Sequence, residues 1–176
     1  DNVSLLSIFK NDIKTHSLNF QHQNMIVANH SFTTIQPMEH GDSEYLIDFG
    51  KEYLGYIDFE IEAVKGTIFD FFLFESIHQD GRIEHTFSLN NSLRYISTDG
   101  RQRYRSYVPR GFRYMLLTIR NLKNPCKIFT IKVDVTTFPT GNAGSFNSSD
   151  YQLNQIWEIS KHTIRMCAQD TIIDCP

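Results

Sequence analysis

Short segments rich in β-branched and aromatic residues follow one another across residues 45–137, with turn residues between them. The segment 67–74 (TIFDFFLF) consists largely of such residues, and the segment 127–137 alternates apolar and polar side chains with the period of two that strands show. Asp80-Gly81 and Asp99-Gly100 are typical of tight hairpins, because glycine accepts the positive φ that these turns need. The pattern predicts an all-β, antiparallel β-sandwich that is jelly-roll-like.

The composition of the chain changes on both sides of this strand-rich region. Residues 1–37 mix apolar and polar side chains without a clear period, so we expect an N-terminal linker or lead-in strand there. Residues 38–140 form the predicted sandwich domain. A proline and two glycines within residues 139–144 mark a linker, so residues 141–176 are expected to hold that linker and one helix.

The helix is expected to begin near Ser149. Ser149 and Gln152 have the spacing of a capping box, and the charge of Asp150 complements the positive end of the helix dipole. Apolar side chains then recur every three or four residues on one face: Leu153, Ile156, Trp157, Ile164, Cys167 and Ala168. Such a face needs a partner, which is either a set of further helices, the sandwich itself or a second copy.

Charge and cysteine spacing argue against several classes of function. The formal net charge of −3 does not favour nucleic-acid binding, and no segment approaches the length of about 18 apolar residues that a membrane helix needs. Cys126, Cys167 and Cys175 lack the spacing of a metal site and are interpreted as reduced structural thiols. We therefore expect no metal, no cofactor, no nucleic acid and no membrane partner. The compartment stays open, with a bacterial cytoplasm favoured.

Charged residues in the strand region allow two interpretations. Glu75, Asp80, Glu84 and His85 lie around one predicted turn and resemble an acid/base cluster, but hairpin tips collect polar residues for solvation, and that explanation is preferred. Glu75 and Arg113 each lie next to apolar strand residues. A charge in such a place is expected to be paired, so we predict a structural ion pair between them that fixes strand register.

Three tyrosines form a candidate sugar-stacking surface. Tyr95, Tyr104 and Tyr107 lie in and around the arginine-rich segment 101–105. Exposed aromatic rings can stack on the C–H faces of sugars. The alternative is ordinary pairing of arginine and aromatic residues on one half-exposed strand, and the alternation of the two residue types favours that alternative.

A run near the C-terminus combines the fragments Phe146, Ser149-Asp150, Leu153-Asn154, Ile156-Trp157 and Asp174-Cys175-Pro176. Four further motifs precede it in the sandwich: Asp48-Phe49-Gly50, Glu75 to Gly81, Leu93 to Ile96, and Gly111 to Tyr114. In this order they resemble the bacterial α-L-rhamnosidases of glycoside hydrolase family 78, over about three quarters of the chain. One departure is Phe74, which stands where the family has glycine.

The resemblance implies a β-sandwich followed by an (α/α)6 barrel of which the C-terminal helix is the first. It also implies inverting hydrolysis of terminal α-L-rhamnosides, with the general acid and base in a region beyond Pro176. No catalytic residue is therefore expected in this chain, which is expected to be inactive alone. Asp174 is the one position that the resemblance places at the rhamnose site. The implied partners are a rhamnose-containing glycan or plant glycoside and the remainder of the helical barrel.

Two other functions stay open. One is a free-standing carbohydrate-binding or interaction module, and the other is a non-hydrolytic protein with the same architecture. An amphipathic helix that ends in Asp174-Cys175-Pro176 has no use in a free module, and this favours the enzyme fragment.

Overall fold

The computed structural model describes residues 2–3, 5–6, 20–21, 32–78, 81, 83, 90–141 and 143–174. Its elements in chain order are β1 (Asn2–Val3), β2 (Leu5–Leu6), β3 (Phe20–Gln21), β4 (Thr33–Ile35), β5 (Ser43–Ala63), β6 (Ile68–Phe74), β7 (Ser92–Ile96), β8 (Gly100–Arg105), β9 (Arg110–Arg120), β10 (Cys126–Val135) and α1 (Tyr151–Cys167). All pairings between these strands are antiparallel.

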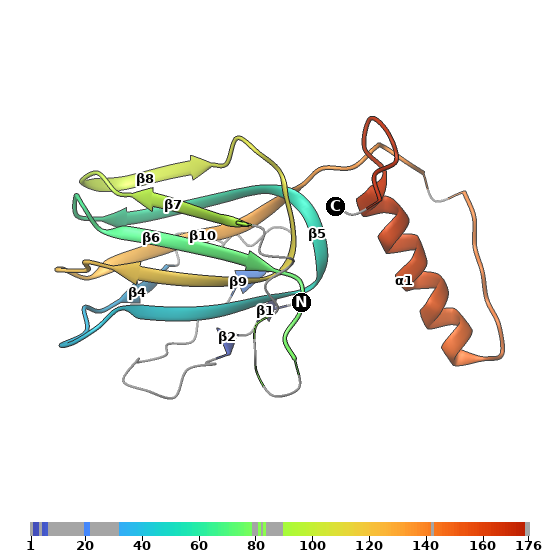
Figure 1. Cartoon of the computed structure of the whole chain (residues 1–176), viewed down its shortest axis with the longest axis horizontal. Helices are drawn as coiled ribbons and strands as arrows, with labels where there is room; N and C mark the ends of the chain where they lie inside the picture. Colours follow the sequence, from blue (N-terminus) through green and yellow to red (C-terminus); the bar gives the residue numbers. More distant parts are fainter. Residues whose placement is uncertain are drawn as a thin grey trace.

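The long strand β5 belongs to both layers of the sandwich. Its first part, as far as Asp48, pairs with β9, and this pairing resumes at Tyr53 and continues to Gly55. Its last part, from Gly55, pairs with β10. Strand β8 pairs with the end of β5, whereas β6 and β7 continue the layer of β9. β5 is one strand of 21 residues that bends around the end of the sandwich (Figure 1).

The bend in β5 has a local cause. The register shifts between Asp48 and Tyr53, and Gly50 has a φ of 81°, which side chains other than glycine's rarely permit. The carboxylate of Asp48 accepts a hydrogen bond of 2.7 Å from the amide of Gly50. The short sequence Asp-Phe-Gly therefore turns the chain from one layer into the other.

Aromatic side chains fill the space between the two layers. The ring of Phe59 on β5 lies 4.8 Å, centroid to centroid, from that of Phe71 on β6 in the opposite layer. Phe49 and Phe112 meet edge to face at 5.1 Å beside the bend, and all four rings are buried. Contacts of this kind across the layers confirm the predicted all-β sandwich. The division at residues 37/38 and 140/141 and the (α/α)6 barrel stay predictions.

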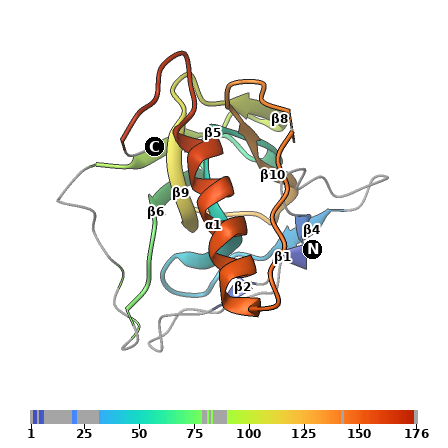
Figure 2. The ribbon, with the colours of Figure 1, turned by 90° about the vertical axis from the view of Figure 1, so that its right-hand side faces the viewer.

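The helix begins one residue later than the capping box predicted. Asp150 is the N-cap, because its carboxylate accepts a hydrogen bond of 2.8 Å from the amide of Gln152. Ser148 contributes through its hydroxyl, which accepts from the amide of Asp150 at 3.1 Å. Asp150 combines the capping acceptor and the negative charge in one side chain, so the helix does not need Ser149 as its cap. Figure 2 shows α1 running across the end of the sandwich.

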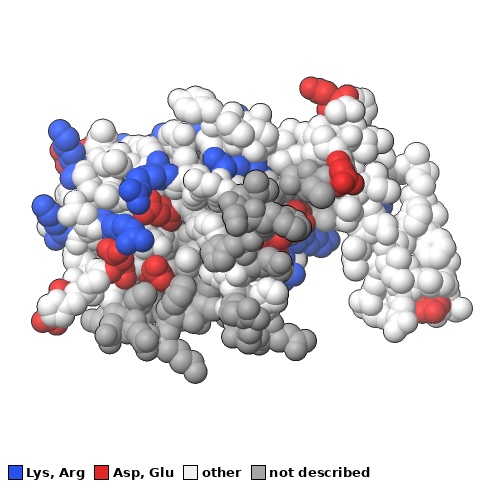
Figure 3. Space-filling model, in the orientation of Figure 1, with Lys and Arg blue, Asp and Glu red and all other residues white. Residues whose placement is uncertain are grey.

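Ion pairs cover the outer face of the layer formed by β8, β5 and β10. Arg103 binds Asp58 through two nitrogens, and Lys132 approaches the same carboxylate at 3.3 Å. The side chain of Asp58 is only 1% exposed. Burial opposes its ionised form, but the hydrogen bonds and charges of Arg103 and Lys132 outweigh that effect and lower its pKa. Figure 3 shows basic and acidic side chains intermixed over the end of the sandwich opposite α1.

Replacing Gly55 by alanine is expected to destabilise the sandwich by about 1–3 kcal/mol, as overpacking does. An added Cβ would lie 2.7 Å from Cγ2 of Val133 and 2.9 Å from the carbonyl carbon of Asp134, both on β10. Gly141→Ala is the matched control, because no atom lies within 4 Å of the added carbon. Urea unfolding of both variants measures the difference; equal stabilities would contradict the prediction.

Replacing Asp58 by asparagine is expected to lower the free energy of unfolding at neutral pH by about 3 kcal/mol. The reason is that the largely buried ammonium group of Lys132 then loses one of the negative charges that compensate it. A lowered carboxyl pKa stabilises the fold above the ordinary pKa of aspartate, and that contribution is lost as pH falls through the lowered value. The difference in stability between wild type and Asp58→Asn should therefore become smaller at acid pH. Thermal unfolding between pH 7 and acid pH measures it, and a gap independent of pH would contradict this account.

Candidate functional site

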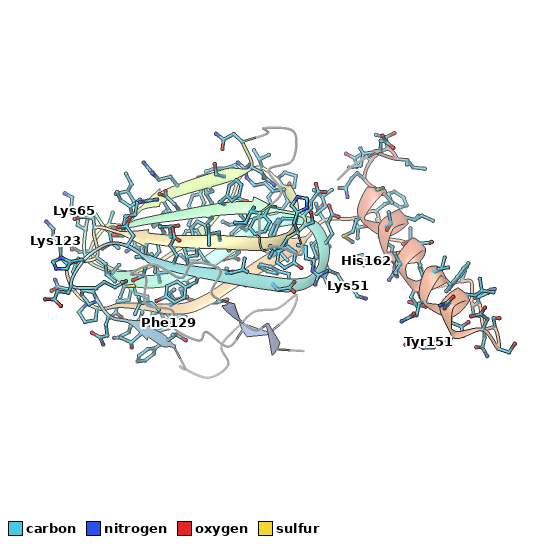
Figure 4. The ribbon with its side chains drawn as sticks, turned by 60° about the horizontal axis from the view of Figure 1, so that its bottom comes forward. Lys51, Lys65, Lys123, Phe129, Tyr151 and His162 are labelled. Carbon is cyan, nitrogen blue, oxygen red and sulfur yellow. The ribbon has the colours of Figure 1, made fainter. Side chains whose placement is uncertain are left out.

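A cavity of about 620 Å³ lies between the bend of β5 and α1. Its sandwich wall comes from the bend itself, from the residue after β6 and from β9, whereas its other wall is the side of α1 that faces the sandwich. In Figure 4, Lys51 and His162 are labelled on these two walls, and Lys65 and Lys123 lie at the opposite end of the molecule. The principal lining residues are Lys51, Glu52, Glu75, Arg113, Gln155, Glu158, Ile159 and His162.

His162 attaches the middle of α1 to the bend of β5. Its Nε2 lies 2.6 Å from the carbonyl oxygen of Glu52, and its ring meets that of Tyr53 edge to face at 5.4 Å. One turn further on, Sδ of Met166 accepts a hydrogen bond of 3.5 Å from the amide of Leu54. The sequence analysis missed His162, because a single histidine on a helix carries no signal of its partner.

The residues that follow β10 also hold the C-terminal end of α1. The amide of Phe138 donates to the carbonyl oxygen of Ala168 at 2.7 Å. The side chain of Gln169 donates to the carbonyl oxygen of Thr136 at 2.9 Å. These bonds join the segment just after β10 to the segment just after α1. The helix therefore has a defined position against the sandwich, and the cavity is preformed.

Arg113 forms an ion pair as predicted, but its partner is Asp48 and not Glu75. Arg113 donates from Nε and Nη2 to the two carboxylate oxygens of Asp48, each at 2.9 Å. Asp48 lies on β5 directly opposite Tyr114 of β9, and Tyr114 is the residue that follows Arg113. Glu75, by contrast, lies beyond the end of β6 and is exposed. In the sequence, Asp48 was noted only as part of the Asp-Phe-Gly motif, and that motif does not indicate which residue pairs with its carboxylate.

One carboxylate of the cavity, that of Glu52, has a shifted pKa. Burial and then the nearby charge of Glu75 raise the pKa of Glu52 above its ordinary value. Within the part of the chain that the structure describes, no basic side chain forms an ion pair with Glu52 or Glu75. Glu158 differs, since Nζ of Lys161 binds it at 2.7 Å. The cavity therefore contains acceptors that are free to bind a ligand.

The three tyrosines do not form one stacking surface. Tyr95 and Tyr104 are half-buried, and both rings contact Phe59 in the core, at 5.1 and 5.6 Å. Only Tyr107 is strongly exposed, at 88%. The arginines between them point outward and pair with acids; Arg101, for example, binds Glu60 at 2.5 Å. The alternation separates an inner aromatic row from an outer basic row, as a half-exposed strand does.

The remaining predicted site residues lie apart from the cavity. Asp174 is exposed beyond α1, where its carbonyl oxygen is 3.7 Å from Sγ of Cys167. Asp80, Glu84 and His85 lie outside the described residues. Burial raises the pKa of the Cys126 thiol to about 12, which leaves it protonated and unreactive at neutral pH.

Metal and membrane sites can be tested only within the described ranges. There, no group of three or more His, Cys, Asp or Glu side chains is arranged to hold a metal ion. The only described helix, α1, lacks the length and apolarity that crossing a bilayer demands.

Replacing Glu52 by glutamine is expected to raise the melting temperature at pH 7. A carboxyl pKa raised by folding means that stability decreases as pH rises from the ordinary value through the raised one. The variant removes that penalty, so it should match wild type near about pH 3.5, where the carboxyl group is protonated in both states. Thermal unfolding at both pH values measures this. Glu39→Gln, at an exposed position outside the cavity, is the control; the same gain in both variants would contradict the prediction.

Comparison with known proteins identifies the fold family. Residues 38–136 match the model of the bacterial α-L-rhamnosidase concanavalin-like domain. The family 78 rhamnosidase of Bacillus sp. GL1 is 43% identical, with a TM-score of 0.82 over 86% of this chain and 16% of that enzyme. Among curated protein sequences, none matches the chain.

More distant structures share the fold. A rhamnosidase from Klebsiella oxytoca with rhamnose bound has a TM-score of 0.67 at 15% identity, over 98% of this chain and 35% of that one. The α-L-rhamnosidase of Aspergillus terreus has a TM-score of 0.55 at 18% identity, over 85% of this chain and 18% of that one. The chain thus spans only a small part of these enzymes. On the family match and the Bacillus likeness, the chain belongs to the bacterial α-L-rhamnosidase family.

Proposed function

We propose that this chain is a non-catalytic module of a protein that hydrolyses terminal α-L-rhamnosides. Its role is to hold α1 in the position from which a helical catalytic domain packs. The observation that carries the proposal is that apolar side chains of α1 stay exposed on its outer side, away from the sandwich. Ile156 is 57% exposed and Ile164 is 69% exposed on that outer side.

The helical repeat explains this orientation. With about 3.6 residues per turn, Gln155, His162 and Met166 fall on one side of α1, which is the side that meets the sandwich. Leu153 and Ile164 fall on the opposite side. Exposed apolar side chains gathered on one side of a helix mark a surface for another element to cover. The sandwich cannot cover it, so further helices are its proposed partner.

The chemistry is proposed to take place outside this chain. Inverting glycoside hydrolysis needs a carboxylic acid and a carboxylate roughly 6.5–9.5 Å apart, with a water molecule between the carboxylate and the anomeric carbon. The resemblance assigns both groups to the helical domain. Asp174 is the single residue of this chain proposed to touch the sugar, as a hydrogen-bond acceptor for its hydroxyl groups. Its exposed place shortly after α1 in the sequence supports this.

A free-standing carbohydrate-binding module is the second candidate. It has less support, because Tyr95 and Tyr104 contact the core instead of offering their faces to a sugar. A free-standing module also does not account for the exposed apolar side chains of α1.

The protein encoded by the whole gene should hydrolyse 4-nitrophenyl α-L-rhamnoside and release the β-anomer of rhamnose first, as single displacement inverts the anomeric carbon. The chain 1–176 alone should show no turnover. Release of nitrophenol and proton NMR of the fresh product measure both. Turnover by the chain alone, absence of hydrolysis by the whole protein, or the α-anomer as first product would contradict the proposal.

The double variant Ile156→Glu/Ile164→Glu tests the role of α1 itself. In the whole protein it should abolish hydrolysis or prevent folding of the helical domain, because two charges enter a packed apolar interface. In the chain 1–176 the same changes should alter stability by about 0.5 kcal/mol or less, because both side chains are exposed. The control is Ile96→Glu, an equally exposed position on β7. Full activity of the double variant would argue against the proposed packing.

A further inference from the structure

We propose that the cavity between the bend of β5 and α1 is a second sugar-binding site that takes one neutral polyhydroxylated unit, such as a single residue of a glycan. The inference goes beyond the proposed function, because it needs no hydrolysis and concerns a place formed entirely by this chain.

The size and rigidity of the cavity suit such a ligand. Its volume of about 620 Å³ lies within the range of roughly 300–1,000 Å³ that small-molecule sites have. The sandwich and α1 form opposite walls, and the bond of 2.6 Å between His162 and the carbonyl oxygen of Glu52 connects them directly. A preformed space avoids the entropic cost of ordering its walls when a ligand binds.

The acceptors of the site are carboxylates without a cation of their own. Glu52 is half-buried, and neither it nor Glu75 forms an ion pair within the described residues. Both residues line the same cavity, and the charge of Glu75 adds to burial in raising the pKa of Glu52. A carboxylate with little water around it gains from hydroxyl donors, and two neighbouring hydroxyl groups of a sugar can supply hydrogen bonds to both oxygens.

The donors of the site come from both walls. Arg113 uses Nε and Nη2 for Asp48, so its position is fixed while its Nη1 stays available to a ligand. Lys51 on the sandwich wall and Gln155 on the helix wall add further donors. Ile159 contributes an apolar surface against which the C–H face of a sugar ring can pack. Donors, acceptors and an apolar wall within one cavity match the mixed surface of a sugar.

Other ligand classes fit less well. The carboxylates of Glu52, Glu75 and Glu158 outnumber the permanent cations of the lining, Lys51 and Arg113, so an anion such as phosphate is disfavoured. A metal ion is disfavoured because no suitable group of three ligands exists among the described residues. A small organic cation is the strongest competitor, since it would relieve the repulsion between Glu52 and Glu75.

Saturation-transfer NMR on the chain 1–176 with L-rhamnose and D-galactose tests the proposal. At least one sugar should receive saturation from the protein, with a dissociation constant in roughly the millimolar range that a few hydrogen bonds provide. Glu75→Gln and Gln155→Ala should each weaken binding, the first by about tenfold, since a hydrogen bond to a charged group is lost. Both positions are exposed, so melting temperatures that are no lower than that of wild type should show that the variants fold.

The matched control is Glu39→Gln, an exposed carboxylate near the other end of the sandwich, which should bind like wild type. No saturation transfer to either sugar would overturn the proposal, as would equal affinities in Glu75→Gln and wild type. Tetramethylammonium serves as the competing probe: if it binds more tightly than both sugars and loses affinity in Glu75→Gln, the cavity is a cation site and the proposal fails. None of these results depends on rhamnosidase activity of the whole protein, so the two proposals succeed or fail separately.

Discussion

The carboxylate of Asp48 connects the parts of this molecule that must stay together. One of its oxygens accepts from the amide of Gly50, and both oxygens accept from the guanidinium group of Arg113. The first bond supports the bend at which β5 leaves one layer for the other. The bonds from Arg113 tie that bend to the neighbouring strand β9. Because hydrogen bonds to an ionised carboxylate are strong, a single side chain stabilises both the turn and its attachment.

The bend in turn provides the surface on which α1 lies. Glu52 offers its carbonyl oxygen to His162, and the amide of Leu54 approaches Met166, so the last turns of the helix follow the path of β5. These contacts occupy the side of α1 that meets the sandwich, and Ile156 and Ile164 are left exposed on the outer side. The same geometry creates the cavity and the exposed stripe, which is why the two proposals concern opposite sides of one helix.

Much of the fold was predictable because it depends on local patterns. The period-two segments and the Gly-Phe-Arg-Tyr strand anticipated the antiparallel layers, and the motif order anticipated the family. Asp99-Gly100 was expected to close a hairpin, yet β7 pairs with β6 and β8 pairs with β5, so this turn connects strands that are not paired with each other. The site was less predictable, because charges on different strands find partners through register. Arg113 was expected to pair with Glu75, yet register places Asp48 beside it. Tyr95 and Tyr104 were candidates for a surface, yet the pleat turns both toward Phe59.

The sequence by itself determined that the chain alternates apolar and polar residues in short strands, that one amphipathic helix follows, and that its motifs belong to the rhamnosidase family. These features are local, so spacing along the chain suffices to read them. Only the tertiary structure decided that β5 is continuous through both layers and that His162 and Glu52 meet, although 110 residues separate them. It also decided which side of α1 faces the sandwich. Contacts between distant residues depend on how layers pack and in what register, and no spacing in the sequence encodes that arrangement directly.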